Sequence, residues 1–466
     1  MKKQITLIMV VFMLISILGC SSHIGNTVEY SAKDIENELK GYEGTQFESG
    51  AEISERVIVD EKMLKVTVKG INYDDANEEV DLELFIENKS GKKLKIYTEN
   101  EFINEYMYGI FNIYDQLIGV NEVKTLNIKS SYSNLELSGI DQIRCFGFDL
   151  FIDDVTEYTY LGDEYLSVRD IEFRTDKYDD THSIDKTKLK KEMLLSISNN
   201  NDGSDETATK IVYLSIEDLY KNDQVEVLLE MVSSTKTENG STYWLKIMVY
   251  NPTDKNVNIN MSNFKINDVL VMDTDDYLNR PLIKPKKIST FFFYYSTTDL
   301  IELGEVKTMS VDIKSNEYTT GDETRVFGGD TVNITLKRGT LDVSVSGEEV
   351  YNDNGITINY VGLEMPSDSK YSKYGYIYFW VDNSNNDKGI TFDISNENFE
   401  VNGREITEYF IPMMVPKGCK AIYSTLVNAE NMGITDKDDI GKLSFDIILS
   451  DTFGEVIDQK SCKLYR

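Results

Sequence analysis

Histidine is nearly absent from this sequence, which excludes several catalytic and metal-binding arrangements. The 466 residues include two histidines, His23 and His182, and both lie outside the segments with strand-like patterning. A Ser-His-Asp triad, a Cys-His pair and a histidine-ligated zinc site each need histidine as base or ligand. The glycines form neither a G-x-G-x-x-G motif nor a P-loop. We therefore expect no catalysis and no cofactor; a hydrolase that uses carboxylates alone is the less favoured enzymatic alternative.

Cysteine is scarce as well. Of four cysteines, Cys20 is assigned below to a lipid anchor, which leaves Cys145, Cys419 and Cys462. No two have the spacing of zinc ligands. Because three is an odd number, at least one thiol is free or pairs between chains. We expect all three to be reduced and packed in cores, and a Cys419–Cys462 disulfide stays open as an alternative.

Basic residues are few relative to acidic ones. The chain has 48 Lys and Arg against 80 Asp and Glu, a formal net charge of −32. Such a surface repels nucleic acid, so we expect no nucleic-acid partner. Two compact acidic clusters, at 273–276 and 436–439, could attract a hard cation. Neither has the glycine and closing glutamate of a twelve-residue calcium loop, so we interpret both as solvated turns and expect no metal site.

The first twenty residues have the pattern of an export signal. Lys2 and Lys3 precede the apolar run Ile5–Leu18, and Gly19 stands directly before Cys20. The run is too short to span a bilayer as a mature helix. It resembles the lipobox of bacterial lipoproteins, although Leu18 stands where that motif usually has Ala or Ser. The resemblance implies a signal peptide over 1–19, acylation of Cys20 by chains such as palmitate, and a place on the outer face of the cell membrane. Residues 20–54 are expected to form a flexible tether.

One strand-like segment recurs three times and ends in Asn88, Asn251 and Asn383. Small polar residues follow each asparagine, which we expect to begin a turn. Counting back from it, the residues at two, four and six places are apolar in all three copies. Period-two placement puts these nine on one face of a sheet, which should face a core. They are Leu82, Leu84, Ile86, Leu245, Ile247, Val249, Ile377, Phe379 and Val381.

Downstream landmarks keep the same spacing in every copy. A phenylalanine step ending in Asn104, Asn267 or Asn402 comes first, and an apolar strand containing Asp149, Asp312 or Asp446 follows. Each aspartate lies 61 to 63 residues after the first asparagine of its copy. By the alternation of a strand, these aspartates should face solvent or a cross-strand lysine.

The copies define three domain-sized units, 55–175, 209–338 and 339–466. Short strands and regularly spaced turns predict three tandem antiparallel β-sandwiches of the immunoglobulin-like type, an all-β fold. The linker or insertion at 176–208 has no counterpart between units 2 and 3. Leu189, Met193 and Ile197 are spaced as on one face of a helix, which would be a linker helix or a cap on a sheet edge.

The recurring motifs resemble the immunoglobulin-like domains of surface lipoproteins from low-GC Gram-positive bacteria. Besides the asparagine and aspartate positions, they include Pro285-Lys286 and Pro416-Lys417 at matched turns. Unit 1 departs from this pattern, because Asn121-Glu122 stands there instead. The resemblance implies sandwich folds and surface display, and it implies no catalytic residues.

A possible binding face comes from the other side of the central strands. Tyr376, Tyr378 and Trp380 alternate with the core residues of unit 3, and Trp244 and Met248 do so in unit 2. A row of exposed aromatic rings could stack on sugars or contact a protein; the alternative is that a loop or neighbouring domain covers it. We expect a membrane-anchored extracellular binding or adhesion module for an unknown protein or glycan. A structural or stress-related envelope spacer without a small ligand is the alternative.

Overall fold

The computed structural model describes most of the chain from Val28 onward. The fold is all-β with four short helices in the described part. Cys20, His23 and His182 lie outside the described residues, as do the acidic clusters at 273–276 and 436–439. The described ranges are 28–107, 111–156, 163–179, 184–199, 209–216, 220–237, 240–272, 282–296, 300–301, 303–304, 306–317, 330–335, 343, 345, 347–365, 374–395, 397–405, 410–434 and 440–465.

Unit 1 contains two antiparallel layers. Its first sheet has the order β2 (Arg56–Glu61), β3 (Leu64–Asp74), β4 (Glu79–Asn88) and β8 (Val123–Ser131). Its second layer contains β10 (Asp163–Arg174), β9 (Cys145–Asp154), β5 (Leu94–Ile103), β6 (Tyr106–Met107) and β7 (Gln116–Ile118). Helix α3 (Tyr132–Leu137) follows β8. Residues of both layers share one hydrophobic cluster, so the unit is a sandwich.

Unit 2 repeats this plan. The first layer has the order β11 (Thr209–Ser215), β12 (Glu226–Thr237), β13 (Gly240–Tyr250) and β17 (Ile288–Ser296). The second contains β19 (Asp330–Thr335), β18 (Thr308–Glu317), β14 (Val257–Ile266), β15 (Val269–Met272) and β16 (Leu282–Ile283). Both layers again contribute to one core.

Unit 3 follows the plan a third time. Its first layer has the order β20 (Glu348–Asp353), β21 (Ile356–Glu364), β22 (Tyr374–Asp382) and β27 (Lys420–Asn428), with helix α5 (Ala429–Met432) after β27. The second layer contains β29 (Val456–Tyr465), β28 (Lys442–Asp451), β23 (Ile390–Ile394), β24 (Glu400–Val401), β25 (Arg404–Glu405) and β26 (Met413–Val415). The all-β sandwich prediction is confirmed, and the immunoglobulin-like character of each unit stays a prediction.

The central strand of each unit is the predicted one. Strands β4, β13 and β22 each lie between two neighbours in the first layer. All nine apolar residues assigned to the core face have 0% solvent exposure. Alternation along a strand therefore placed the core correctly in three separate units.

The asparagine that closes each central strand is buried and holds two segments together. In unit 2, Asn251 Nδ2 donates to the carbonyl oxygens of Lys255, at 2.7 Å, and Ile283, at 2.9 Å. Its Oδ1 accepts from the backbone nitrogen of Thr253, which is the predicted turn. Equivalent bonds run from Asn88 to Lys92 and Gly119, and from Asn383 to Lys388 and Pro416.

The expected tether over 20–54 is wrong from Val28 onward, because this segment packs on unit 2 and then on unit 1. Strand β1 (Val28–Tyr30) pairs with β11, and helix α2 (Ala32–Glu38) packs beside helix α4 (Lys186–Asn199). Ala51 belongs to the core of unit 1. Apolar side chains at Tyr30, Ile35 and Ala51 supply the burial that a solvated tether would lack.

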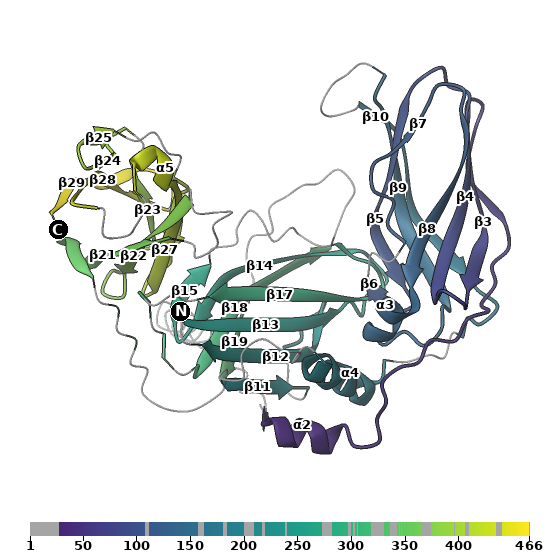
Figure 1. The fold of residues 1–466 in the computed structure, drawn as a ribbon, viewed down its shortest axis with the longest axis horizontal. Coiled ribbons are helices and arrows are strands. Elements are labelled where there is room, and N and C mark those ends of the chain that lie inside the picture. The colour runs from purple at the N-terminus through teal and green to yellow at the C-terminus, as the bar shows by residue number, and fades with distance from the viewer. Residues whose placement is uncertain are drawn as a thin grey trace, which may run out of the picture.

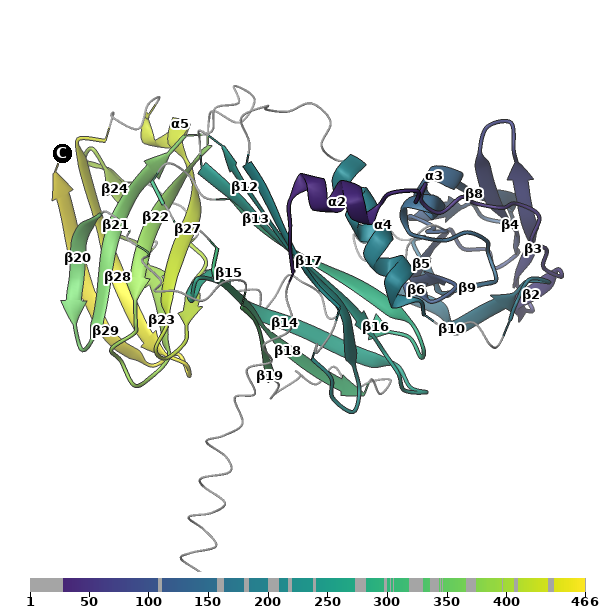
Figure 2. The ribbon, with the colours of Figure 1, turned by 90° about the horizontal axis from the view of Figure 1, so that it is seen from below.

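The three units form a row in which unit 2 lies between units 1 and 3 (Figures 1 and 2). Sheets continue across both boundaries. Strand β17 of unit 2 pairs in parallel with β6 of unit 1, at Ile288 and Tyr106. Strand β27 of unit 3 pairs in parallel with β15 of unit 2, at Lys420 and Val269. The same two positions of the repeat therefore meet at each junction.

Candidate functional site

The predicted aromatic row of unit 3 is mostly covered. Tyr378 and Trp380 are buried and belong to the hydrophobic cluster of unit 2, together with Ile422 of β27. The pairing of β27 with β15 brings this outer face of unit 3 against unit 2. These two residues are therefore not available as a binding face, and the alternative left open, a neighbouring domain that covers them, is the one observed. Tyr376, farther along the strand, is exposed.

In unit 2, helix α4 covers part of the predicted face. Leu189, Met193 and Ile197 lie buried on the helix as predicted, in a cluster that includes Met248 of β13. Met248 is thus buried, so this candidate for the binding face is covered. The helix packs on the outer face of the first layer (Figure 2), so it does not cap a sheet edge and the linker-helix alternative remains.

An exposed group of aromatic side chains remains on β13 and β17, which lie side by side (Figure 1). Trp244 is 41% exposed, Phe292 53% and Tyr294 46%. We call these three the aromatic patch. Trp244 lies directly opposite Tyr294 in the register, with ring centroids 4.4 Å apart. The patch offers ring faces to solvent, which suits stacking or apolar contact.

Sequence reasoning found Trp244 but missed Phe292 and Tyr294. A signal was present in the run Phe291 to Tyr295, where alternation would have separated core-facing from outward-facing rings. Only knowledge that β17 neighbours β13 shows that the two outward rings join Trp244, and that neighbour relation comes from the fold.

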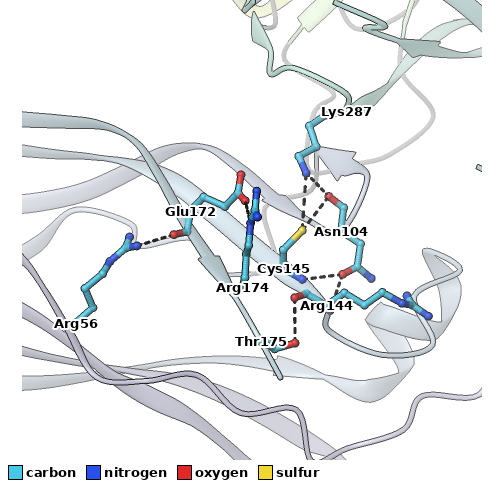
Figure 3. Close-up of polar contacts among 8 residues, drawn as sticks. All are labelled: Arg56, Asn104, Arg144, Cys145, Glu172, Arg174, Thr175 and Lys287. Carbon is cyan, nitrogen blue, oxygen red and sulfur yellow. Dashed lines mark hydrogen bonds and ion pairs between the residues drawn. The ribbon is translucent and has the colours of Figure 1, made fainter. Parts of the chain in front are cut away.

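The junction between units 1 and 2 gathers polar groups around two lysines. Lys287 Nζ donates to the backbone oxygen of Asn104 at 2.7 Å and lies 4.2 Å from the centroid of the Phe102 ring. Figure 3 shows Lys287 reaching Asn104 and Cys145 from the opposite side of the junction. Burial raises the pKa of the Cys145 thiol, which keeps it protonated and unreactive.

Lys284 forms the buried part of this junction. Its Nζ lies 2.7 Å from Asp149 Oδ1 and 2.8 Å from Asp170 Oδ1. The side chains of Lys284 and Asp149 are 4% and 2% exposed, so this ion pair is shielded from water. Asp149 also accepts from Asn100 Nδ2 and from the backbone nitrogen of Asp170. The two contacts of Lys284 therefore join unit 2 to unit 1, and the bonds from Asn100 and Asp170 hold the Asp149 carboxylate in place within unit 1.

The aspartates of the second anchor strand do not simply face solvent. Asp149 and Asp446 are buried, and the expectation is wrong for both. In each unit the carboxylate accepts from an asparagine where the pairing with the neighbouring strand is interrupted, which provides the partner that a buried carboxylate needs. These bonds join Asp149 to Asn100, Asp312 to Asn263 and Asp446 to Asn398 at 2.6–2.8 Å.

Cys145, Cys419 and Cys462 are buried free thiols, as predicted. Within the described ranges, no group of three His, Cys, Asp or Glu side chains is placed to hold a metal ion. No helix in this part of the chain is long and apolar enough to cross a membrane.

Comparison with known proteins gives no family. No family model and no curated protein matches the chain. A trypsin-activated alpha-2-macroglobulin from Escherichia coli aligns with 82% of this chain at 8% identity and a TM-score of 0.14, and the alignment spans 29% of that protein's length. The BSP domain of a biofilm-associated protein aligns over 91% of this chain and 98% of its own, at 8% identity and a TM-score of 0.12. Scores this low carry no argument about this chain.

Proposed function

We propose that the chain is a membrane-anchored extracellular binding module that contacts a protein or glycan partner through the aromatic patch. The observation that carries the proposal is the exposure of Trp244, Phe292 and Tyr294 on two adjacent strands. On the first layer of unit 3, by contrast, the outward-facing side chains of Tyr378 and Trp380 are buried against unit 2. Because sheets run across both unit boundaries, the patch is held in a fixed position relative to units 1 and 3.

An anchor at Cys20 would restrict the orientation of the molecule on the membrane more than a flexible tether would. Cys20 precedes β1 by eight residues, and β1 is an edge strand of the sheet of unit 2. Eight extended residues reach about 28 Å at most. A lipidated Cys20 would therefore hold the central unit near the membrane, with units 1 and 3 on either side.

The charge of the chain limits the partner class. At a formal net charge of −32, anionic polymers are repelled, so a neutral glycan or an apolar protein surface fits the patch best. Aromatic rings stack on the apolar faces of sugar rings without needing opposite charge.

A binding assay with matched variants tests the proposal. The protein from Ser21 to Arg466 would be incubated with cell-envelope glycan and protein fractions, and retention measured. We expect the triple variant Trp244→Ser, Phe292→Ser, Tyr294→Ser to lose at least ten-fold in retention. Phe453→Ser, which removes a 92% exposed ring from unit 3, is the control and should bind normally. Equal retention of all proteins would contradict the role of the patch.

A structural spacer is the second candidate, favoured by one observation. Both junctions use the same parallel strand pairing, which gives a continuous row of units whatever the patch does. A spacer requires the junctions and no ligand. The spacer hypothesis predicts that the triple variant supports the cell envelope as well as the parent protein does. A variant with a weakened junction should not.

A further inference from the structure

A pocket of about 280 Å³ lies beside the aromatic patch, where unit 1, helix α4 and the first layer of unit 2 meet. Unit 1 contributes β6 and the end of α3, and unit 2 contributes β13 and β17. Seven of the fifteen lining residues are apolar, and three of these are flexible methionines. The main apolar residues are Met107, Leu137, Leu189, Met193, Met248 and Phe292.

Two lysines belong to the lining, Lys188 and Lys246, and Lys246 is the one beside Phe292. Lys246 of β13 lies opposite Phe292 in the strand register, and its Nζ is 5.1 Å from the Phe292 ring centroid. Burial lowers the pKa of Lys246 to about 8, and no described carboxylate contributes to the shift. A charged ammonium in such a place is short of a counter-ion.

The other ionisable groups of the lining are engaged elsewhere or neutral. Glu192 of α4 accepts from the hydroxyls of Tyr42 and Thr45. Lys188 of the same helix lies 3.8 Å from Asp141 Oδ2. Burial raises the pKa of Tyr106, so this phenol is neutral at physiological pH. Among the described lining residues, Lys246 is thus the cation without an acidic partner.

We propose that this pocket binds a small amphiphilic anion, with Lys246 holding the carboxylate and the methionine-rich lining holding the apolar tail. Two features argue for a small molecule over a peptide. The volume is close to the lower limit of the range for small-molecule sites, and residues of five elements line it. Methionine side chains adapt to an unbranched chain at little cost. The site does not depend on the proposed macromolecular partner or on the lipid anchor.

Decanoate is a suitable probe, with decanol and decylamine as neutral and cationic analogues of the same length. The protein from Ser21 to Arg466 keeps every residue that the structure describes. Binding at pH 7 would be followed by calorimetry and by the emission of Trp244, two residues from Lys246 on the same face. We expect saturable decanoate binding with one site per chain, at least ten-fold weaker binding of decanol, and none of decylamine.

Three variants separate the charge from the cavity. Lys246→Met should weaken decanoate at least ten-fold and leave decanol unchanged, and Lys246→Arg should keep decanoate binding. Ser196→Phe, which adds volume from the helix side of the pocket, should abolish binding of both decanoate and decanol. Lys463→Met, at an exposed position of unit 3, is the control.

The proposal fails if decanoate does not bind saturably, if decanol binds equally well, or if Lys246→Met binds decanoate like the parent protein. Unfolding transitions of every variant would show whether a loss of binding reflects a loss of fold. The binding assay with envelope fractions uses the triple aromatic variant, so failure there leaves the Lys246 result intact and interpretable.

Discussion

Three asparagines at equivalent positions show how a single side chain fixes the repeat. The amide of Asn383 donates to the carbonyl oxygen of Lys388 across the next turn, and to those of Val415, at the end of β26, and Pro416. An aspartate could not donate and a leucine could not bond, so the position demands an amide. The bonds also align the turns: Lys284 and Pro416 each lie 33 residues after their asparagine. The two Pro-Lys pairs matched from sequence are therefore offset by one position.

Replacing Asn383 with alanine should destabilise unit 3 by about 2–4 kcal/mol, because three buried or partly buried carbonyl groups lose the bond from this buried donor. Asn385→Ala, two residues away at an exposed position, should change stability by less than about 0.5 kcal/mol. Chemical denaturation of both variants measures the difference. Equal stability of the two would show that the asparagine bonds contribute nothing net.

Glu230 gives a prediction about pH. It is buried on β12, and burial raises its pKa from 4.5 to about 8. Because the folded pKa exceeds the unfolded one, the carboxyl group costs nothing below pH 4.5, and its destabilising effect grows up to pH 8. Above pH 8 the cost is on the order of 5 kcal/mol. Glu230→Gln should therefore be more stable than the parent, by a margin that widens from pH 5.5 to pH 9 in denaturation experiments.

Glu226 on the same strand is the matched control for Glu230. Burial alone would raise the pKa of Glu226, but bonds to Lys221 and Lys186 outweigh it and lower the pKa below its usual value. Glu226→Gln should therefore give no stabilisation at pH 9. A pH-independent difference between Glu230→Gln and the parent would contradict the assignment of a buried, protonated carboxyl group.

At the scale of elements, the sequence predicted what depends on local periodicity. The central strands, their core faces and the helix around Met193 all follow from spacing along the chain. The burial of Trp380 and Met248 could not be predicted from periodicity, because the segments that cover these side chains lie elsewhere in the sequence. The prediction of a flexible tether before unit 1 was wrong for a related reason. Its polar composition suggested a tether, but Tyr30 and Ile35 find apolar partners on α4 only in the folded chain.

Helix α2 should hold β1 on the edge of the unit 2 sheet. Ile35 is buried in the cluster with Leu194 of α4, so Ile35→Asp should release α2 and with it β1. Hydrogen exchange would then speed up in β11, the only described neighbour of β1 in the sheet. Lys33→Asp, at an exposed position of the same helix, should leave exchange unchanged. Unaltered exchange in the Ile35 variant would mean that β1 is held without the helix.

For the whole molecule, the two junctions explain the row of units. At each junction, the short strand that follows Asn104 or Asn267 (β6 or β15) pairs with the last strand of the first layer in the next unit (β17 or β27). The chemistry differs, since Lys284 and Asp149 form a buried ion pair at the first junction and apolar side chains such as Trp380 fill the second. Sequence repeats revealed the units but not their contacts, because a junction pairs residues more than a hundred positions apart.

Lys284→Met should weaken the first junction by about 3–5 kcal/mol, because Asp149 would remain buried without its counter-ion. Lys286→Met removes an exposed ion pair with Asp254 from the same turn and should cost less than about 1 kcal/mol. Calorimetry would show units 1 and 2 unfolding together in the parent and in Lys286→Met, and separately in Lys284→Met. Identical transitions in both variants would rule out the buried pair as the link.

The most direct test of the proposed binding module uses Trp244 as the reporter. Trp380→Phe leaves Trp244 as the only tryptophan of the chain, which has two in total. Acrylamide quenching of this variant would be measured alone and with cell-envelope glycan and protein fractions. The account predicts strong quenching of the free protein and clear protection by one fraction, with the protection lost in the Phe292→Ser, Tyr294→Ser variant. Quenching that no fraction alters would contradict a binding role for the aromatic patch.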